Sequence, residues 1–103
     1  MSDGEKRADD EKRSLALLEA NHSFPGDFPL TVIALNSDEV TEALVRSIEE
    51  GLSEPLAADA RESRLSSGGK YMSHRLRVPC AAAADVIRLY ARVRQVSGVV
   101  TVL

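Results

Sequence analysis

The feature that most constrains this chain is the strict alternation in residues 70–78, which read KYMSHRLRV. Every second position carries a side chain suited to one face of a sheet: Met72, His74, Leu76 and Val78. Successive side chains of a β-strand point to opposite faces, whereas a helix would scatter these residues around its axis. The segment therefore predicts a strand with one covered face and one open face. Pro79 predicts the end of that strand, because proline cannot donate to a sheet ladder.

A glycine pair, Gly68 and Gly69, comes just before this strand. A glycine pair between two alternating segments predicts a two-residue β-hairpin, since both turn residues need positive φ. The same stretch invites comparison with a phosphate-binding loop, whose pattern is Gly, four residues, then Gly-Lys-Ser/Thr. Arg64 stands where the first glycine belongs, and Tyr71 stands where the hydroxyl residue belongs. The segment also joins two strands rather than a strand and a helix, so a turn is the favoured interpretation.

The remaining patterns give a β-α-β-β-α-β order after a first short helix. Apolar β-branched runs predict strands, helical spacing predicts helices, and proline and glycine mark connections. Asn36 or Ser37 can cap the first helix of this repeat, with Glu39 as a capping-box partner, and Gly51 ends it. The expected elements are a helix at 14–21, an irregular connector at 22–29, a strand at 30–35, a helix at 38–51, an edge strand at 58–65, a strand at 70–78, a helix at 80–96 and a strand at 99–103.

This order predicts an α+β, ferredoxin-like βαββαβ fold, with a four-stranded antiparallel sheet and two helices on one face. Because the chain holds no Trp and only 4 % aromatic residues, its core must consist mainly of aliphatic side chains. In the first helix of the repeat, one face carries Val40, Leu44, Val45 and Ile48. In the second, the expected buried stripe is Ala83, Val86, Tyr90 and Val93.

Charge is distributed unevenly along the chain. Residues 1–51 hold five Lys/Arg against twelve Asp/Glu, and residues 52–103 hold eight against four. Such a split can mark a basic face for an anionic partner. The basic excess is small beside that of typical nucleic-acid-binding domains, so nucleic acid is not the favoured partner. Residues 1–13 are almost entirely polar and predict a disordered charged tail, which leaves residues 14–103 as a single domain.

The expected cellular compartment follows from three features that the sequence does not show: a disulfide, a membrane span and a signal peptide. Cys80 is the one cysteine, so no internal disulfide can form. No run of about 18 apolar residues occurs, which argues against a membrane span. The charged N-terminus has no apolar segment and does not read as a signal peptide. These observations predict a cytoplasmic protein that does not enter a membrane.

Several stretches resemble the YbeD-like bacterial domain family of unknown function. They are FPGDFPLTVIAL at 24–35, SSGGKYMSHRLRV at 66–78, the spacing of Val86, Leu89 and Tyr90, and the terminal VVTVL. The resemblance covers residues 24–103, and its most specific part is Ser-Ser-x-Gly-x-Tyr from Ser66 to Tyr71. It implies a ferredoxin-like, ACT-domain-like fold in a small bacterial cytosolic protein, and it implies no activity.

The open sheet face and the hairpin tip form the candidate binding surface. Its predicted residues are Ser66, Ser67, Lys70, Tyr71, Ser73, Arg75 and Arg77, which Thr31 and Ile33 can join from the first strand. His74 shares an apolar face and reads as a core residue, and Cys80 reads as structural. With no nucleophile–base pair and no metal-ligand set in view, we expect no catalytic residues, no cofactor and no metal.

The expected function is therefore that of a small non-enzymatic regulatory or protein-interaction domain. Its protein partner is unknown from the sequence, and a free sheet edge would also allow a homodimer. One alternative is weak nucleic-acid binding on the open face, where a tyrosine lies near arginines. A second is an ACT-like sensor of small molecules. Amino-acid-binding ACT domains carry a glycine after the first strand, and the ALNSDEV loop here has none.

Overall fold

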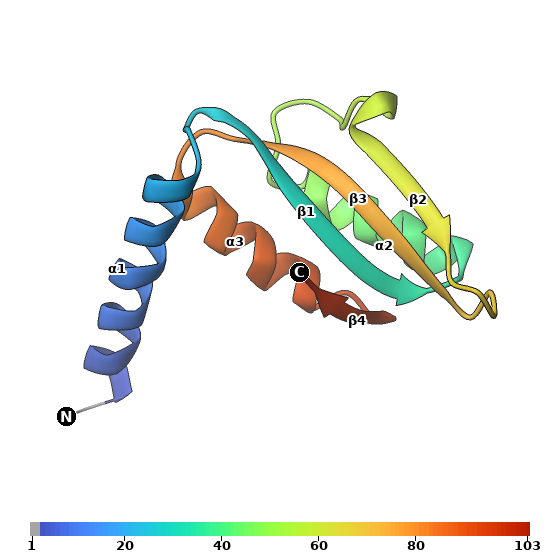
Figure 1. Ribbon diagram of the computed structural model, residues 1–103, viewed down its shortest axis with the longest axis horizontal. Helices are drawn as coiled ribbons and strands as arrows, with labels where there is room; N and C mark the ends of the chain where they lie inside the picture. The colour runs from blue at the N-terminus through green and yellow to red at the C-terminus, as the bar shows by residue number, and fades with distance from the viewer. Residues whose placement is uncertain (1–2) are drawn as a thin grey trace.

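The computed structural model describes residues 3–103, with side chains from residue 9 onward. The elements are helix α1 (Asp3–Asn21), strand β1 (Gly26–Leu35), helix α2 (Asp38–Glu49), the short 3₁₀ segment η1 (Ala58–Ala60), strands β2 (Arg61–Leu65) and β3 (Tyr71–Cys80), helix α3 (Ala83–Arg94) and strand β4 (Val99–Val102). The strands pair antiparallel in the order β2-β3-β1-β4, which confirms the predicted α+β, ferredoxin-like arrangement. Helices α2 and α3 lie along one side of the sheet (Figure 1).

Strands β1 and β3 form the centre of the sheet and supply one wall of the core. Opposite residues in this pair point to the same face, so Leu30 with Leu76 and Val32 with His74 turn toward the helices. Leu44 and Ile48 of α2 and three α3 residues close the core from the other side. The α3 residues are Val86, Leu89 and Val93. The core is aliphatic, as the composition requires.

The predicted stripe of the second helix needs one correction. Leu89 is buried, whereas Tyr90 is half-buried and its hydroxyl donates to the Leu103 carbonyl at 3.0 Å. A phenol hydroxyl needs a hydrogen-bond partner when it leaves water, and the C-terminal backbone beside α3 offers one. The helix also begins at Ala83 rather than at Cys80, because Cys80 is still paired with Gly26 in the sheet.

Both prolines at the strand ends were expected outside the strands, and both lie inside them. Pro29 pairs with Arg77, and Pro79 pairs with Asp27. Thr31 N–H donates toward β4. Backbone direction alternates along a strand, so the backbone nitrogen of Pro29 also points to the β4 side. It lies there beyond the last paired residue of β4. Pro79 likewise directs its backbone toward the β2 side, where it has no partner, because β2 begins at Arg61, opposite Leu76. Neither ring removes a ladder hydrogen bond, which is why the strands run longer than the sequence predicts.

The turn between β2 and β3 is a hairpin, but it is longer than the predicted two-residue turn. Gly69 N–H donates to the Ser66 carbonyl at 2.9 Å, and Ser66 N–H donates to the Tyr71 carbonyl at 2.9 Å. Four residues, 67–70, therefore separate the last paired residues. Only Gly69 of the two glycines has positive φ, at 73°. This geometry suits a four-residue loop with a left-handed glycine at its third position.

Helix α1 includes most of the segment that was expected to be a disordered tail. Residues 3–13 continue the helix that the sequence predicts for 14–21. The side chains of residues 9–14 are exposed, and α1 projects from the body of the molecule (Figure 1). Leu18 is the α1 residue that packs against the core cluster. The helix is therefore held by its own backbone hydrogen bonds and by packing at its C-terminal end. No helix in residues 3–103 has the length and apolar character needed to cross a membrane.

Gly98 provides a test of how tightly α2 packs against the β4 end of the sheet. It has φ of 95°, and a Cβ added there would lie 2.6 Å from a Val40 methyl group. We expect Gly98→Ala to lower the free energy of unfolding by about 2–3 kcal/mol, from backbone strain and this overlap together. Gly69→Ala is the matched control, because its φ is also positive but nothing lies within 4 Å. Chemical denaturation measures both.

The Val40 contribution can be separated by a double substitution. Val40→Ala should recover part of the loss in the Gly98→Ala background, because it removes the methyl groups that the new Cβ meets. Equal losses for Gly98→Ala and Gly69→Ala would show that only backbone strain matters at Gly98.

Candidate functional site

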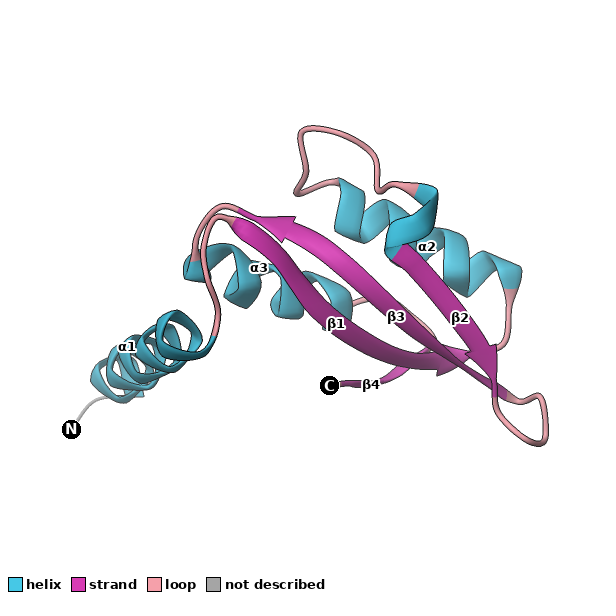
Figure 2. Cartoon of the chain, turned by 45° about the horizontal axis from the view of Figure 1, so that its top comes forward, coloured by secondary structure: helices cyan, strands magenta, loops and turns pink. Residues whose placement is uncertain are grey.

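The face of the sheet opposite α2 and α3 carries four of the predicted binding residues. Tyr71, Ser73, Arg75 and Arg77 occupy alternate positions of β3 on this open face, whereas their neighbours turn into the core. Arg75 and Arg77 are exposed, and Tyr71 and Ser73 are half-buried. Figure 2 shows this side of β1, β2 and β3 without a helix over it. The alternation of residues 70–78 therefore placed these side chains on the correct face.

The seven predicted residues form a strip along β3 and the hairpin, and Arg77 at one end of this strip also lines a cavity. Tyr71 and Arg77 are six positions apart along one strand, which corresponds to about 20 Å. Arg77 is held at its end of the strip, where its guanidinium donates to the Asp59 carbonyl at 2.6 Å. Ser66, Ser67 and Lys70 lie in the hairpin at the other end. A surface of this length suits contact with another macromolecule.

The hairpin tip is fixed to the sheet by the loop that follows β1. Asn36 N–H donates to the Lys70 carbonyl at 3.0 Å, and the Asn36 side-chain amide donates to the Gly69 carbonyl at 2.9 Å. The Ser66 hydroxyl accepts from Tyr71 N–H at 3.1 Å. Of the two predicted helix caps, Ser37 caps α2 and accepts from Val40 N–H at 3.4 Å, and Asn36 engages the hairpin instead. These bonds order the part of the surface that carries Ser67 and Lys70.

Apolar residues on and beside the open face were missed in the sequence. Leu35 is opposite Tyr71 and is 40 % exposed. Leu103 exchanges backbone hydrogen bonds with Thr31 and is 63 % exposed. Opposite residues share a face, so both leucines lie on the open side with Ile33. The terminal VVTVL run could have indicated Leu103, if its register against β1 had been known.

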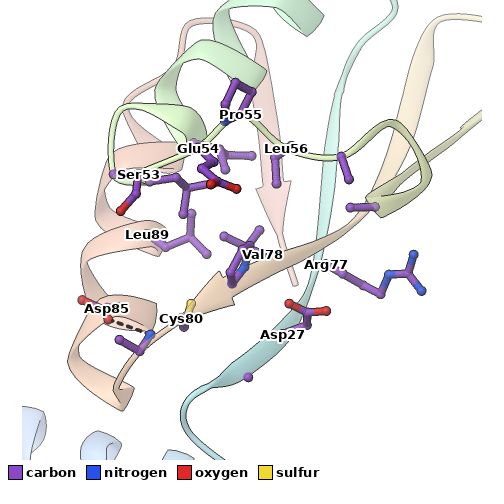
Figure 3. A pocket seen from close by; sticks show the side chains of 18 of the residues that line it. Asp27, Ser53, Glu54, Pro55, Leu56, Arg77, Val78, Cys80, Asp85 and Leu89 are labelled. Atoms are coloured by element: carbon purple, nitrogen blue, oxygen red, sulfur yellow. Dashed lines mark hydrogen bonds between the residues drawn. The ribbon is translucent and has the colours of Figure 1, made fainter.

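A second feature is an open cavity of about 830 Å³ at the end of β3 that is distant from the hairpin, next to Arg77. Its walls are the start of β1, the loop at 51–57, the end of β3 and one side of α3. In Figure 3, Leu56 and Glu54 approach from the loop, and Val78 and Leu89 face them from β3 and α3. The Glu49 carboxylate accepts from Leu56 N–H at 2.8 Å and fastens the loop to α2. The sequence did not indicate this cavity, because its walls come from four separate segments.

Cys80 lies in this cavity wall but is chemically unsuited to attack a substrate. Burial raises the pKa of its thiol, and the nearby carboxylates of Asp85 and Asp27 raise it further. A thiolate is the reactive form of cysteine, so a raised pKa suppresses reactivity. The Asp85 carboxylate accepts from Ala81 and Ala82 N–H, which caps the start of α3. Its hydrogen bond with Arg88 holds the pKa of Asp85 below the ordinary value. Asp85 is thus a structural residue.

His74 is the one buried polar side chain among those described, at 1 % exposure. Its Nδ1 lies 2.8 Å from the Ser63 hydroxyl of β2, and its Nε2 has no hydrogen-bond partner. Burial lowers the pKa of His74, and the positive charge of Arg61 lowers it further. The ring is therefore neutral near pH 7 and ties the edge strand β2 to the core. Within residues 9–103, no cluster of three or more His, Cys, Asp or Glu side chains could hold a metal ion.

The fold and the open sheet face define a small α+β ferredoxin-like domain. The family model described as "Protein of unknown function (DUF493)" matches residues 19–103. The chain belongs to this family, which is the YbeD-like family that the sequence resembled. No curated protein matches the chain.

We expect loss of the Asn36 amide to loosen the hairpin tip without unfolding the domain. Asn36→Ala removes the hydrogen bond to Gly69 and should cost about 0.5–1.5 kcal/mol of local stability. Amide hydrogen exchange should become faster at residues 66–71. Asn21→Ala is a matched control, because that amide bonds only to Leu17 within α1. Unchanged exchange at the hairpin would mean that backbone bonds alone order the tip.

We also expect His74 to make stability depend on pH. In the unfolded chain a histidine takes up a proton near pH 6.5, whereas the folded His74 does so only at lower pH. The unfolded state therefore gains protons first as pH falls. The stability from this neutral ring is present above about pH 6.5 and is lost as pH falls toward the folded pKa. His74→Leu should flatten the pH dependence of the free energy of unfolding between about pH 7.5 and 5.5.

Denaturant unfolding at a series of pH values measures this effect. His22→Gln is the control, because His22 lies outside the core cluster. If the His74→Leu variant kept the full slope, the pH dependence would have to come from other groups.

Proposed function

We propose that this protein is a non-enzymatic regulatory or protein-interaction domain of the bacterial cytosol, and that its open sheet face binds a protein partner. The observation that supports the proposal most strongly is the composition of that face. Arg75 and Arg77 are exposed, and they share this face with the exposed or half-buried apolar residues Ile33, Leu35 and Leu103. Arginine, tyrosine and apolar side chains in one patch are typical of protein interfaces. The partner surface that fits it presents apolar residues flanked by carboxylates.

The non-enzymatic part of the proposal rests on where the reactive residue types lie. Cys80 and His74 are six positions apart on β3, about 20 Å, so they form no nucleophile–base pair. The raised pKa of the Cys80 thiol also supports a non-enzymatic role, because it disfavours the reactive thiolate. A binding role needs neither residue.

The nucleic-acid alternative is less well supported. Base stacking on the open face would depend on Tyr71, and the Lys70 ammonium group lies over that ring, 5.3 Å from its centroid. Glu62 also lies opposite Arg75 on β2 and reduces the positive potential of the face. The small-molecule alternative meets a similar difficulty, because the loop after β1 has no glycine and Asn36 engages the hairpin.

Site-specific photo-crosslinking in cells tests the proposal. A photoreactive amino acid at Ser73, in the middle of the open face, should trap a partner protein. The same amino acid at Ala91, on the exposed side of α3, is the control and should trap much less. Arg75→Glu should reduce the Ser73 crosslink about tenfold, because it places an acidic group against the acidic partner.

Nuclease treatment before analysis separates the two macromolecular alternatives. A protein crosslink that survives nuclease and depends on Arg75 supports the proposal. Crosslinks that appear only with intact nucleic acid would support the alternative. Equal crosslinking from Ser73 and Ala91 would contradict a specific open-face site.

A further inference from the structure

We propose that two copies of this chain associate through the outer edges of β2, joining their sheets into one antiparallel sheet. This proposal does not depend on the proposed function, because it rests on the backbone groups and charges of β2, whereas the proposed function rests on residues of β1, β3 and the segment after β4. The edge is accessible: all five residues of β2 are exposed, and β2 pairs with β3 on one side only. No other strand in residues 3–103 lies along its outer side.

The hydrogen-bonding groups along that edge can be identified from the hairpin. Ser66 N–H donates to the Tyr71 carbonyl, so Ser66 directs its backbone toward β3. Backbone direction alternates along an antiparallel strand, and Arg64 and Glu62 therefore also bond to β3. Arg61, Ser63 and Leu65 direct their N–H and C=O groups outward. These are the free groups that a neighbouring strand can use.

The sequence of β2, RESRL, is self-complementary about Ser63. When two β2 strands pair antiparallel with Ser63 at the twofold axis, Glu62 lies opposite Arg64 of the partner subunit. By symmetry, Arg64 lies opposite Glu62 of the partner subunit. Both pairs stand on the open face, since Glu62 and Arg64 share that face with Arg75 and Ser73. Opposite charges in such cross-strand positions stabilise a sheet.

Other symmetric registers are penalised by the same charges. A shift of two residues, which keeps the outward groups matched, places Glu62 against Glu62 of the partner subunit or Arg64 against Arg64 of the partner subunit. A one-residue shift would place open-face side chains on the covered side. The Ser63-centred register is therefore the one that the charges of β2 favour.

The same register also brings together the β2 side chains on the sheet face that carries the helices. A groove of about 460 Å³ is lined mainly by α2 residues and by Arg61 of β2. Its charged lining residues are Asp38, Glu42, Glu49, Arg46 and Arg61. Leu65 aligns with Met72, which aligns with Ala34 near the start of α2. In this register, Arg61 of the partner subunit pairs with Leu65. Leu65, 52 % exposed in the single chain, becomes covered.

Charge reversal at the edge provides the experiment. Sedimentation velocity of the full chain over a concentration series should show a species of twice the 11.2 kDa chain mass. Glu62→Arg and Arg64→Glu each replace two opposite-charge pairs by two like-charge pairs. Each should raise the dissociation constant about tenfold or more. Glu50→Arg, an exposed charge reversal at the end of α2, is the matched control and should leave the dimer intact.

Mixing the two variants gives the sharpest outcome. The Glu62→Arg chain and the Arg64→Glu chain should each be monomeric alone and should form a heterodimer together, because every edge pair is then complementary. The double variant in one chain should also recover the dimer. Circular dichroism confirms that each variant is folded. A wild-type chain that stays monomeric at all concentrations overturns the proposal, and so does a dimer that both single reversals leave unchanged.

Discussion

Strands β1 and β3 pair antiparallel over ten residues each, and the rest of the molecule is attached to this pair. The pairing matters because opposite residues share a face. Leu30, Val32, Leu76 and Val78 are thereby gathered on one side, and the helices can remove them from water only by packing there. The other side of the same pair is left open, so one constraint produces both the core and the candidate binding surface.

The strands that flank this central pair, β2 and β4, are attached to the core by different interactions. On one side, β2 is joined to the core through Ser63 and His74, a buried ring held by a single hydrogen bond. On the other side, β4 is bonded to β1 near Thr31, and the Tyr90 hydroxyl fastens the last residue to α3. The β2 edge presents charges that match a second copy of themselves. The buried His74 ring therefore holds in place the same strand, β2, whose charged residues form the outer edge of the sheet.

Much of the fold could be predicted because the spacing of apolar residues and the positions of glycine and proline are local signals. The alternation of residues 70–78 located β3 and both of its faces, and the Gly68–Gly69 pair located the hairpin. The errors arose where a neighbouring strand decides the outcome. Pro29 and Pro79 remain in strands because neither has a paired residue beside it on its outer side, where β4 and β2 respectively do not reach. The side chain of Leu89 is buried because of where α3 crosses the sheet, which helical periodicity alone leaves ambiguous.

The candidate site divides in the same way. The sequence by itself determined that Tyr71, Ser73, Arg75 and Arg77 share a face, since alternation along one strand requires no knowledge of neighbours. Only the tertiary structure decided that Leu35 and Leu103 lie on that face, that Asn36 anchors the hairpin tip, and that four segments enclose the cavity beside Cys80. These features depend on register and packing between residues far apart in the chain. Such contacts form only when the β1–β3 pair fixes which segments meet.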